Sequence, residues 1–304
     1  MFHILSGFVR VVKGFWNFLA RKWLRIFQIS DIIKCQILSW PKGGLFMLLH
    51  VLAIGDVVGE GGQDILSRRL PELRERLGVH FCVVNGENAS GVGITPAQAR
   101  RILEAGADVI TLGNHTWNRI QIGAFLDKEP RILRPANYAG RVPGRGAGVY
   151  RCQGLDILVM NLMGRVDLNA NLDSPFKAAN FLLSRERYDL VLVDFHAEAT
   201  SEKGAMGWHL DGRAAAVWGT HTHVPTADCQ VLPQGTGFVT DLGMTGPVRS
   251  VLGIKPENSL NLFLGGLPRR YEEAEGNCKL NGCLFAIDTE KKKCVDVTRT
   301  DIIE

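Results

Sequence analysis

The chain has 304 residues, of which 46% are hydrophobic and 22% charged, and its formal net charge is +4. These proportions are typical of globular proteins and exclude a wholly disordered or collagen-like chain. The charge is uneven, because residues 1–46 hold seven Lys or Arg and one acid, a net of +6, which leaves −2 for the other 258 residues. The basic excess therefore belongs to one terminal segment, and the rest of the chain gives no electrostatic argument for binding a long nucleic acid.

Residues 1–46 are predicted to form a basic amphipathic helix followed by a linker. Polar and basic residues such as Arg10, Lys13 and Arg21 recur every three or four positions, opposite an apolar face rich in Phe and Trp. Such a helix fits the plane of a membrane surface, but no run of 18 uncharged apolar residues exists to span a membrane. Two other interpretations stay open: the helix docks on its own domain or a partner, or translation starts at Met47 and the segment is an artefact.

From Met47 the sequence alternates short apolar runs with helical patterns. We predict buried strands at residues 48–54, 80–84, 108–112, 190–193, 215–218 and 237–240. A stripe of leucines predicts two helical pieces over residues 61–77, broken by Pro71. Thr95 and Gln98 form a predicted capping box whose helix ends at Gly106, and Ser174 opens another helix. Strands alternating with helices predict crossover connections, a largely parallel sheet and one domain over residues 47–304.

The end of the chain has a different pattern. Asn281-Gly282 is the dipeptide typical of a tight β-hairpin, and residues 294–298 read as a further strand, so we expect antiparallel pairing there. The charged run at residues 290–293 is expected to be a solvated turn. The seven cysteines are odd in number and contain no Cys-x-x-Cys pair. They predict reduced thiols in a cytoplasmic protein rather than a disulfide framework.

Polar side chains follow the predicted strands one after another. The strands end in Gly55-Asp56, Asn85-Gly86-Glu87-Asn88, Gly113-Asn114-His115, Asp194-Phe195-His196 and Gly219-Thr220-His221-Thr222-His223. The carboxyl ends of parallel strands meet at one edge of a sheet, where ligands bind. We expect His221 and His223 to lie on an extended segment with both rings on one side, unobstructed because Gly219 has no side chain. Each of these five motifs alone is weak evidence for a metal site, but all five in this order predict one.

The chemistry of these groups indicates the metal. A mixture of Asp, Glu, Asn and His ligands without thiolate favours Fe, Mn or Zn. Seven candidate ligands exceed the needs of one ion, so we expect two. Two adjacent divalent ions stabilise the attacking and leaving oxygens in phosphoryl transfer and lower the pKa of bound water. A hydroxide bridging both ions is the expected nucleophile.

The order of these motifs resembles the calcineurin-like metallophosphoesterase superfamily. The segments IGDVVGEGG, VVNGENASGVGIT, LGNHTW, VDFHAEATSEK and GTHTHVPTAD are closest to its YmdB branch, a group of bacterial cyclic-nucleotide phosphodiesterases. The likeness covers residues 47–304. It implies a four-layer α/β/β/α sandwich around two sheets, and a centre of two divalent ions, Fe or Mn before Zn.

The resemblance also implies a role for each motif residue. One ion would be held by Asp56, Glu87, Asn88 and His223, and the other by Glu87, Asn114, His196 and His221. Glu87 would bridge the two ions, and His115 would act as the general acid at the leaving oxygen. Two positions depart from the wider superfamily: Val58 stands where a His is usual, and the bridging residue is Glu87 instead of Asp.

The sequence therefore predicts a phosphoric diester hydrolase acting on small cyclic nucleotides, most of all the 2′,3′-cyclic kind. A phosphoprotein or RNA-end phosphatase on the same fold, or a regulatory binding protein with incidental hydrolysis, are the alternatives. Substrate contacts stay open: Ser90, Gly91 and Gly93 form either a phosphate-binding loop or a flexible turn. Arg165, Lys203, Asp241 and Thr245 are further candidates. We also expect a homo-oligomer, and membrane contact by residues 1–46 alone.

Overall fold

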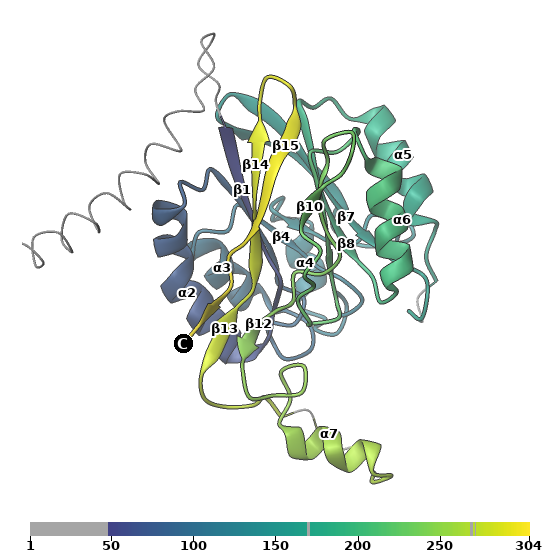
Figure 1. The fold of residues 1–304 in the computed structure, drawn as a ribbon. Helices are drawn as coiled ribbons and strands as arrows, with labels where there is room; N and C mark the ends of the chain where they lie inside the picture. Colours follow the sequence, from purple (N-terminus) through teal and green to yellow (C-terminus); the bar gives the residue numbers. More distant parts are fainter. Residues whose placement is uncertain (1–47, 169–170, 268–269, 271) are drawn as a thin grey trace, which may run out of the picture. The chain divides into compact units, whose positions relative to one another are not determined.

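The computed structural model describes residues 48–168, 171–267, 270 and 272–304. The predictions for the N-terminal extension, its membrane contact and its start site lie outside these residues. In the described part, two six-stranded sheets pack face to face, with α2 and α3 covering one outer face and α5 and α6 the other (Figure 1). The predicted four-layer α/β/β/α sandwich is confirmed.

The first sheet has the strand order β15-β14-β1-β3-β4-β5. Its parallel strands are β1 (Leu48–Ile54), β3 (Phe81–Asn85), β4 (Val109–Thr111) and β5 (Ile132–Leu133). The antiparallel strands β14 (Gly282–Asp288) and β15 (Lys293–Arg299) complete it. Helices α2 (Gly59–Arg76) and α3 (Pro96–Glu104) pack on its outer face.

The second sheet has the order β10-β11-β9-β8-β7-β6. Its parallel strands are β7 (Leu155–Met163), β8 (Leu190–His196), β9 (Ala216–Thr220) and β11 (Gly237–Val239), flanked by antiparallel β6 (Ala147–Cys152) and β10 (Gln230–Val231). Its outer face is covered by α5 (Pro175–Arg185) and α6 (Thr200–Leu210).

A third, four-stranded sheet and two short helices complete the described elements. The small sheet has the order β16 (Ile302–Ile303), β13 (Cys278–Leu280), β12 (Met244–Pro247) and β2 (Asp56–Val57). The short helices are α4 (Ile122–Leu126) and α7 (Pro256–Phe263), and α7 projects from the body of the sandwich (Figure 1). No residue of α7 is buried.

The strand period of two divides the apolar residues between two cores. In β1, Val51 and Ala53 join the core between the two sheets, whereas Leu52 and Ile54 join the core under α2. The inner face of β8 begins with Leu190 and Leu192 and continues with Asp194 and His196. The space between the sheets is therefore apolar along most of its length and polar at the carboxyl ends of the strands.

All six predicted strands are present, with ends shifted by no more than about three residues, and the Thr95–Gln98 capping box is formed. The two helical pieces predicted around Pro71 are wrong, because α2 is a single helix with Pro71 inside it. A proline costs a helix one hydrogen bond and a steric clash. Leu66, Leu70 and Leu73 are fully buried along the same face of α2, and this burial holds the helix together across the proline.

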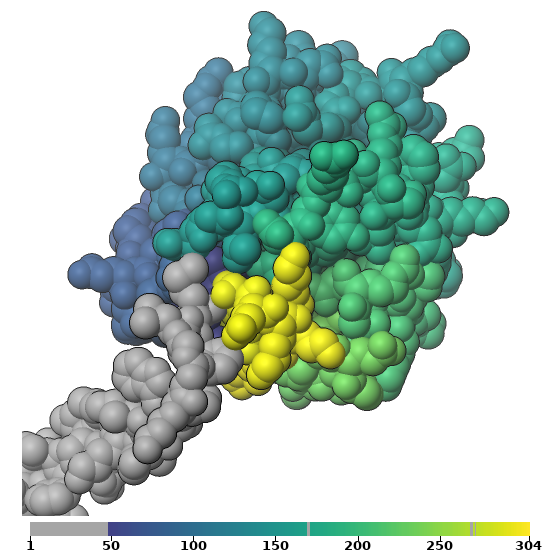
Figure 2. Space-filling model, turned by 90° about the horizontal axis from the view of Figure 1, so that it is seen from above, coloured from purple at the N-terminus to yellow at the C-terminus, as the bar shows by residue number. Residues whose placement is uncertain are grey.

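The predicted hairpin at Asn281-Gly282 is also wrong. β13 pairs with β12 and β16, whereas β14 pairs with β1 and β15, so the chain changes sheets at Asn281. The hairpin lies further on, between β14 and β15, where the charged run 290–293 is exposed as expected. Figure 2 looks onto this end of the sandwich, where yellow C-terminal residues reach the surface beside teal and green parts of the chain.

Two further predictions concern thiols and membranes. The six cysteines within the described residues are all free, and the reduced state of the thiols stays a prediction. No helix in the described part of the chain is long and apolar enough to cross a bilayer.

Candidate metal centre

The eight predicted site residues meet where the inner faces of the two large sheets turn polar. Asp56 lies in β2, Glu87 and Asn88 follow β3, and Asn114 and His115 follow β4. His196 is the last residue of β8, and His221 and His223 follow β9. Residues up to 167 positions apart in the sequence thus share one small volume, as expected when parallel strands end at a common edge.

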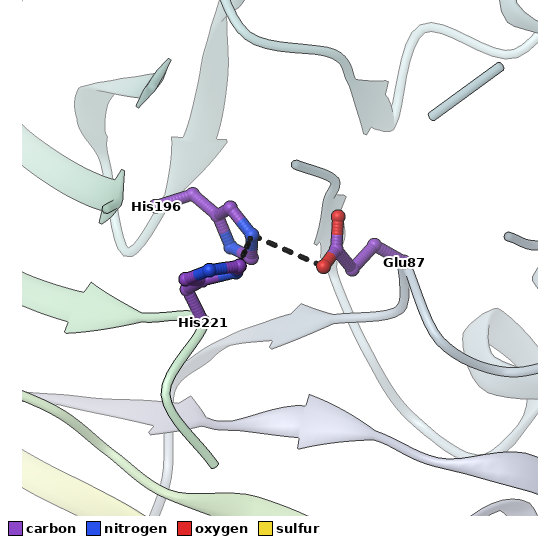
Figure 3. Close-up of side chains that lie close together, drawn as sticks. All are labelled: Glu87, His196 and His221. Carbon is purple, nitrogen blue, oxygen red and sulfur yellow. Dashed lines mark hydrogen bonds and ion pairs between the residues drawn. The ribbon is translucent and has the colours of Figure 1, made fainter. Parts of the chain in front are cut away.

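One group of side chains surrounds the imidazole of His196. Its Nε2 lies 3.0 Å from Oε1 of Glu87, 2.9 Å from Oδ1 of Asn114 and 3.1 Å from Nδ1 of His221. Figure 3 shows Glu87, His196 and His221 pointing toward one another from three separate segments. Their ligand atoms all lie within 4.8 Å of one another, close enough for the three residues to hold one metal ion.

A second group lies on the other side of Glu87. Nδ2 of Asn88 is 3.3 Å from Oε1 of Glu87 and 3.1 Å from Nε2 of His223. Nε2 of His223 is in turn 3.9 Å from Oδ1 of Asp56. Rotating the Asn88 amide by 180° exchanges its nitrogen and oxygen, which would turn a carbonyl oxygen toward the same point. Oε1 of Glu87 thus contacts both groups, and its Oε2 accepts a hydrogen bond from the His115 backbone N–H at 3.0 Å.

Each of the three histidines is held by the ring nitrogen that faces away from its group. Nδ1 of His196 lies 2.9 Å from the Thr220 hydroxyl. Nε2 of His221 lies 3.0 Å from a carboxylate oxygen of Glu198, and Nδ1 of His223 lies 3.1 Å from the Leu252 carbonyl. Metal-ligating histidines are oriented in this way, with the second nitrogen hydrogen-bonded to a carboxylate, carbonyl or hydroxyl.

The donor set fits divalent metal ions. Oδ1 of Asp56 is buried without any hydrogen-bond partner, which is costly for a carboxylate unless a cation neutralises it. Nε2 of His196 carries one hydrogen at most, yet lone-pair atoms of Glu87, Asn114 and His221 all converge on it. A cation satisfies such a set of acceptors, and a proton cannot.

The same crowding shifts the pKa values of the acids and imidazoles. Burial raises the pKa of Asp56 to about 6. Burial acts in the same direction on Glu87, but the charge and hydrogen bond of His196 outweigh it and bring the pKa of Glu87 to about 2. For His196, burial lowers the pKa, and the Glu87 carboxylate reverses this and raises it to about 9. Burial, reinforced by the charge of His196, lowers the pKa of His221 to about 3.

The backbone around the histidines differs from the prediction. β9 ends at Thr220, and His221 and His223 have φ angles of 107° and 65°, so they are not on an extended segment. Each ring joins a different group, and the positive φ angles are backbone strain of the kind found at functional sites. The prediction that Gly219 leaves the two histidines unobstructed is also wrong. A Cβ at Gly219 would lie 1.9 Å from the Thr240 carbonyl oxygen and would not meet the histidines.

The glycine that makes room for the centre is Gly113. A Cβ on Gly113 would lie 2.3 Å from the His196 ring and 2.4 Å from Oε2 of Glu87. No side chain fits there while these two groups stay in contact. The Gly-Asn-His motif thus combines a small residue that lets the sheets approach with two polar residues that face the site.

A cavity of about 350 Å³ opens beside the metal centre. His115 lines it together with Glu87, Asn88, Gly91, Val92, Glu198, His221, Thr222, His223, Leu252 and Ile254. Of the predicted substrate loop, Gly91 reaches the cavity, whereas the Ser90 hydroxyl donates to the Gln98 side chain. Glu198 was not predicted, although its position two residues after His196 on the same loop was a usable signal.

The other candidate substrate contacts do not line this cavity. Lys203 and Asp241 are each 1% exposed and form an ion pair of 2.6 Å, so Lys203 has no free charge to offer a phosphate. Thr245 is fully buried and accepts a hydrogen bond from the Asn281 backbone. Arg165 lines a separate cavity of about 570 Å³ beside α5.

Comparison with known proteins identifies the family. The model of the YmdB-like protein family matches residues 52–300. The chain is 44% identical over 254 residues to a protein of Bacillus subtilis named 2′,3′-cyclic-nucleotide 2′-phosphodiesterase, covering 83% of this chain and 96% of that protein.

Two solved structures share the fold at substantial identity. A phosphatase from Mycoplasma pneumoniae superposes with a TM-score of 0.81 at 34% identity, covering 86% of this chain and 95% of the other. A protein from Thermus thermophilus superposes with a TM-score of 0.80 at 40% identity, covering 84% of this chain and all of the other. The chain therefore belongs to the YmdB-like family of metallophosphoesterases and is an enzyme of that class, a metal-dependent phosphoric diester hydrolase.

Proposed function

We propose that this enzyme hydrolyses small cyclic nucleotides, first of all 2′,3′-cyclic nucleotides, with the help of two divalent metal ions. The Bacillus subtilis relative, which is named for this activity, supports the choice of substrate. The observation that carries the proposal is the convergence of two groups of metal-binding side chains on one carboxylate, Glu87, beside a cavity that contains His115. Iron or manganese suits the oxygen and imidazole ligands best, with zinc as the alternative.

The two groups of side chains supply one ligand set for each ion. Site 1 consists of Asp56, Glu87, Asn88 and His223, and site 2 of Glu87, Asn114, His196 and His221. The contacts of Glu87 with both groups support its role as the shared ligand. Bound ions would supply Lewis acidity for the phosphoryl oxygens and lower the pKa of a water molecule. Only two of the seven ligands are carboxylates, so the set leaves much of the positive charge available to an anionic substrate.

His115 is the group proposed to protonate the departing ribose oxygen. Its backbone N–H donates a hydrogen bond to Glu87, and the residue lines the cavity, so His115 is held between the proposed ligands and the space that a substrate can enter. The cavity is at the small end of the range of about 300–1,000 Å³ found for small-molecule pockets. This size favours a mononucleotide over a phosphoprotein loop or a long RNA.

The substrate proposal is tested by a panel assay on metal-loaded enzyme. Turnover should be fastest on 2′,3′-cyclic AMP, compared with 3′,5′-cyclic AMP, a linear dinucleotide, a 3′-phosphorylated RNA end and a phosphopeptide. Metal content measured on the same sample should approach two ions per chain. Fastest turnover on the phosphopeptide or the RNA end would contradict the substrate, and a content below one ion per chain would contradict the two-ion centre.

The role of His115 is tested by His115→Ala. Loss of a positioned general acid should lower kcat on 2′,3′-cyclic AMP by ~10²–10⁴-fold, while metal content stays at the wild-type level. His209→Ala is the matched control, because His209 lies on α6, where its ring contacts Asn180 and Phe176. Wild-type kcat in His115→Ala would remove the residue from the mechanism.

The cytoplasmic location and the homo-oligomeric state stay predictions from the sequence.

A further inference from the structure

Two cysteines outside the metal centre face each other across the interior of the sandwich. The sulfurs of Cys229 and Cys283 are 3.5 Å apart. Cys229 directly precedes β10, an edge strand of the second sheet, and Cys283 lies on β14 of the first sheet. No other two cysteine sulfurs within the described residues are in contact. We propose that these thiols are a modification site, at which a peroxide forms a reversible disulfide that links the two sheets.

The positions of the two sulfurs suit this bond. Cys283 is fully buried and is held on both sides, by Ala53 of β1 and Arg299 of β15. Cys229 is half-buried against the core between the sheets, so a small peroxide can reach it more easily than Cys283. A disulfide has an S–S distance of about 2.0 Å, so the sulfurs must approach by about 1.5 Å. Most of this movement falls to Cys229, which lies in a loop.

The surroundings assign different roles to the two thiols. The hydrogen bond from Cys283 is the main reason why the pKa of Cys229 falls to about 7, and the guanidinium of Arg299 lowers it further against burial and the charge of Asp228. The pKa of Cys283 is raised by the same contact and by burial. The thiolate is the reactive form of cysteine. Cys229 is therefore the sulfur that is oxidised first, and Cys283 is the one that completes the bond.

The reaction balances in two steps. The Cys229 thiolate attacks one oxygen of hydrogen peroxide and breaks the O–O bond. The departing hydroxide takes up a proton, which leaves a sulfenic acid on Cys229 and one water. The Cys283 thiol then attacks the Cys229 sulfur, its proton leaves with the sulfenic hydroxyl as a second water, and the S–S bond forms. Two electrons pass from the two sulfurs to the peroxide, and a dithiol reductant reverses the change.

The bond would act close to the metal centre. Only five residues separate His223 from Cys229. The Arg299 guanidinium already ties this segment to β15 by donating to the Thr226 carbonyl. A disulfide between Cys229 and Cys283 would add a covalent link to this hydrogen bond. It would anchor the segment that carries His223 to the first sheet.

The test uses the reduced full chain treated with hydrogen peroxide. The mass should fall by two hydrogen atoms, and a non-reducing peptide map should join the peptides of Cys229 and Cys283, with dithiothreitol restoring both thiols. Mapping is needed because the full chain also contains Cys35. Cys229→Ser should reduce the linked peptide to background, whereas Cys283→Ser, which keeps a hydrogen-bond donor beside Cys229, should leave a sulfenic acid on Cys229 that dimedone traps.

Cys152→Ser is the matched control, because Cys152 is also half-buried but its sulfur donates to the His80 carbonyl and meets no second thiol. It should form the linked peptide at the wild-type rate. Circular dichroism of each variant shows whether it has folded. A bond that maps to another pair, or folded wild-type protein that stays reduced or stops at an oxidised Cys229 without the bond, would overturn the proposal.

Discussion

Two buried clusters of charge lie next to each other at the carboxyl ends of the strands, and they differ in how the charge is balanced. In the Lys203–Asp241 pair, Nζ lies 2.6 Å from Oδ2. Oδ2 also accepts from the backbone N–H and the hydroxyl of Thr222, and Oδ1 accepts from the Gly243 N–H. The carboxylate of this pair is fully satisfied by the protein itself.

Asp56 of the candidate metal centre is buried as deeply as Asp241, but the protein itself does not fully satisfy its carboxylate. Asp56 is fully buried, its Oδ1 has no hydrogen-bond partner, and burial raises its pKa to about 6. Buried polar groups are nearly always hydrogen-bonded, and among the four buried side-chain atoms without a partner in the described residues, Oδ1 of Asp56 is the one that belongs to a carboxylate. Asp241 is therefore part of the framework, whereas Asp56 is the carboxylate that we propose as a metal ligand.

Thr222 joins the two clusters. It lies between His221 and His223, and both its backbone N–H and its hydroxyl are bound by Asp241. The Lys203–Asp241 pair therefore holds the turn that brings His221 and His223 to the candidate metal centre. Substitutions in the two clusters should consequently have opposite effects on the stability of the metal-free protein.

The largest expected effect on stability follows from Lys203→Met. Removing one member of a buried ion pair leaves an uncompensated charge and costs about 3–5 kcal/mol. Chemical denaturation of the metal-free protein would measure this as a lower free energy of unfolding. The control is Lys255→Met, because the pair of Lys255 with Glu272 is exposed and should contribute no more than about 1 kcal/mol. A loss of under about 1 kcal/mol for Lys203→Met would remove the distinction between the two pairs.

The next effect has the opposite sign. The folded pKa of Asp56, about 6, lies above its ordinary value of 3.8, so the ionised carboxylate opposes folding above pH 6, and protonation relieves this as the pH falls. Two pKa units correspond to about 3 kcal/mol. Asp56→Asn should therefore stabilise the metal-free protein by about 2–3 kcal/mol at pH 7.5, and the gain should disappear by about pH 4.

The same variant should lose part of the stabilisation that metal provides. Added manganese should raise the melting temperature of the wild-type protein more than that of Asp56→Asn, because the variant removes a ligand of site 1 and leaves the ligands of site 2 in place, and a ligand stabilises only the state that binds it. Denaturation curves from pH 4 to 8, with and without metal, check both the stability gain of the metal-free variant and its smaller response to metal. A metal-free Asp56→Asn protein that is less stable than wild type at pH 7.5 would show that Asp56 is part of the framework after all.

The smallest effect concerns Glu198, which holds the outer nitrogen of His221 while remaining half exposed. Substituting the partner of a metal-binding histidine typically weakens metal affinity by about 10–100-fold. Glu198→Gln should show a loss in this range when the protein competes with a chelator for metal. Glu104→Gln, an exposed change on α3, is the control. Unchanged affinity in Glu198→Gln would mean that His221 is oriented by its backbone alone.

Much of the framework was predictable because its signals are local. Apolar runs of strand length predicted all six strands, and the Thr95–Gln98 capping box predicted the start of α3, since both depend on neighbouring residues. The polar residues after the strands predicted where the site would be, because parallel strands align their carboxyl ends. Seven candidate ligands and His115 could be named from this pattern and the family resemblance, and the fold brings all eight together.

The errors and omissions share a cause: they depend on partners far away in the sequence. Asn281-Gly282 has the local chemistry of a hairpin, but β13 finds its partners in β12 and β16, so the chain changes sheets there instead. Pro71 remains inside α2 because the packing of three leucines outweighs a local penalty. Glu198 was not predicted, and Lys203 was a candidate phosphate contact that turned out to pair with Asp241, because a charged residue gives no sign in the sequence of the group it will face.

The sequence by itself thus determined which residues are apolar, where strands end, and which polar groups stand at those ends, since these follow from side-chain type and spacing. Only the tertiary structure decided how the charges are matched. Lys203 neutralises Asp241, Oδ1 of Asp56 has no hydrogen-bond partner, and the thiols of Cys229 and Cys283 meet between the two sheets. The physical reason is that electrostatic energy and thiol chemistry depend on distances of a few ångströms and on burial, which the packing of two sheets sets and the order of residues does not.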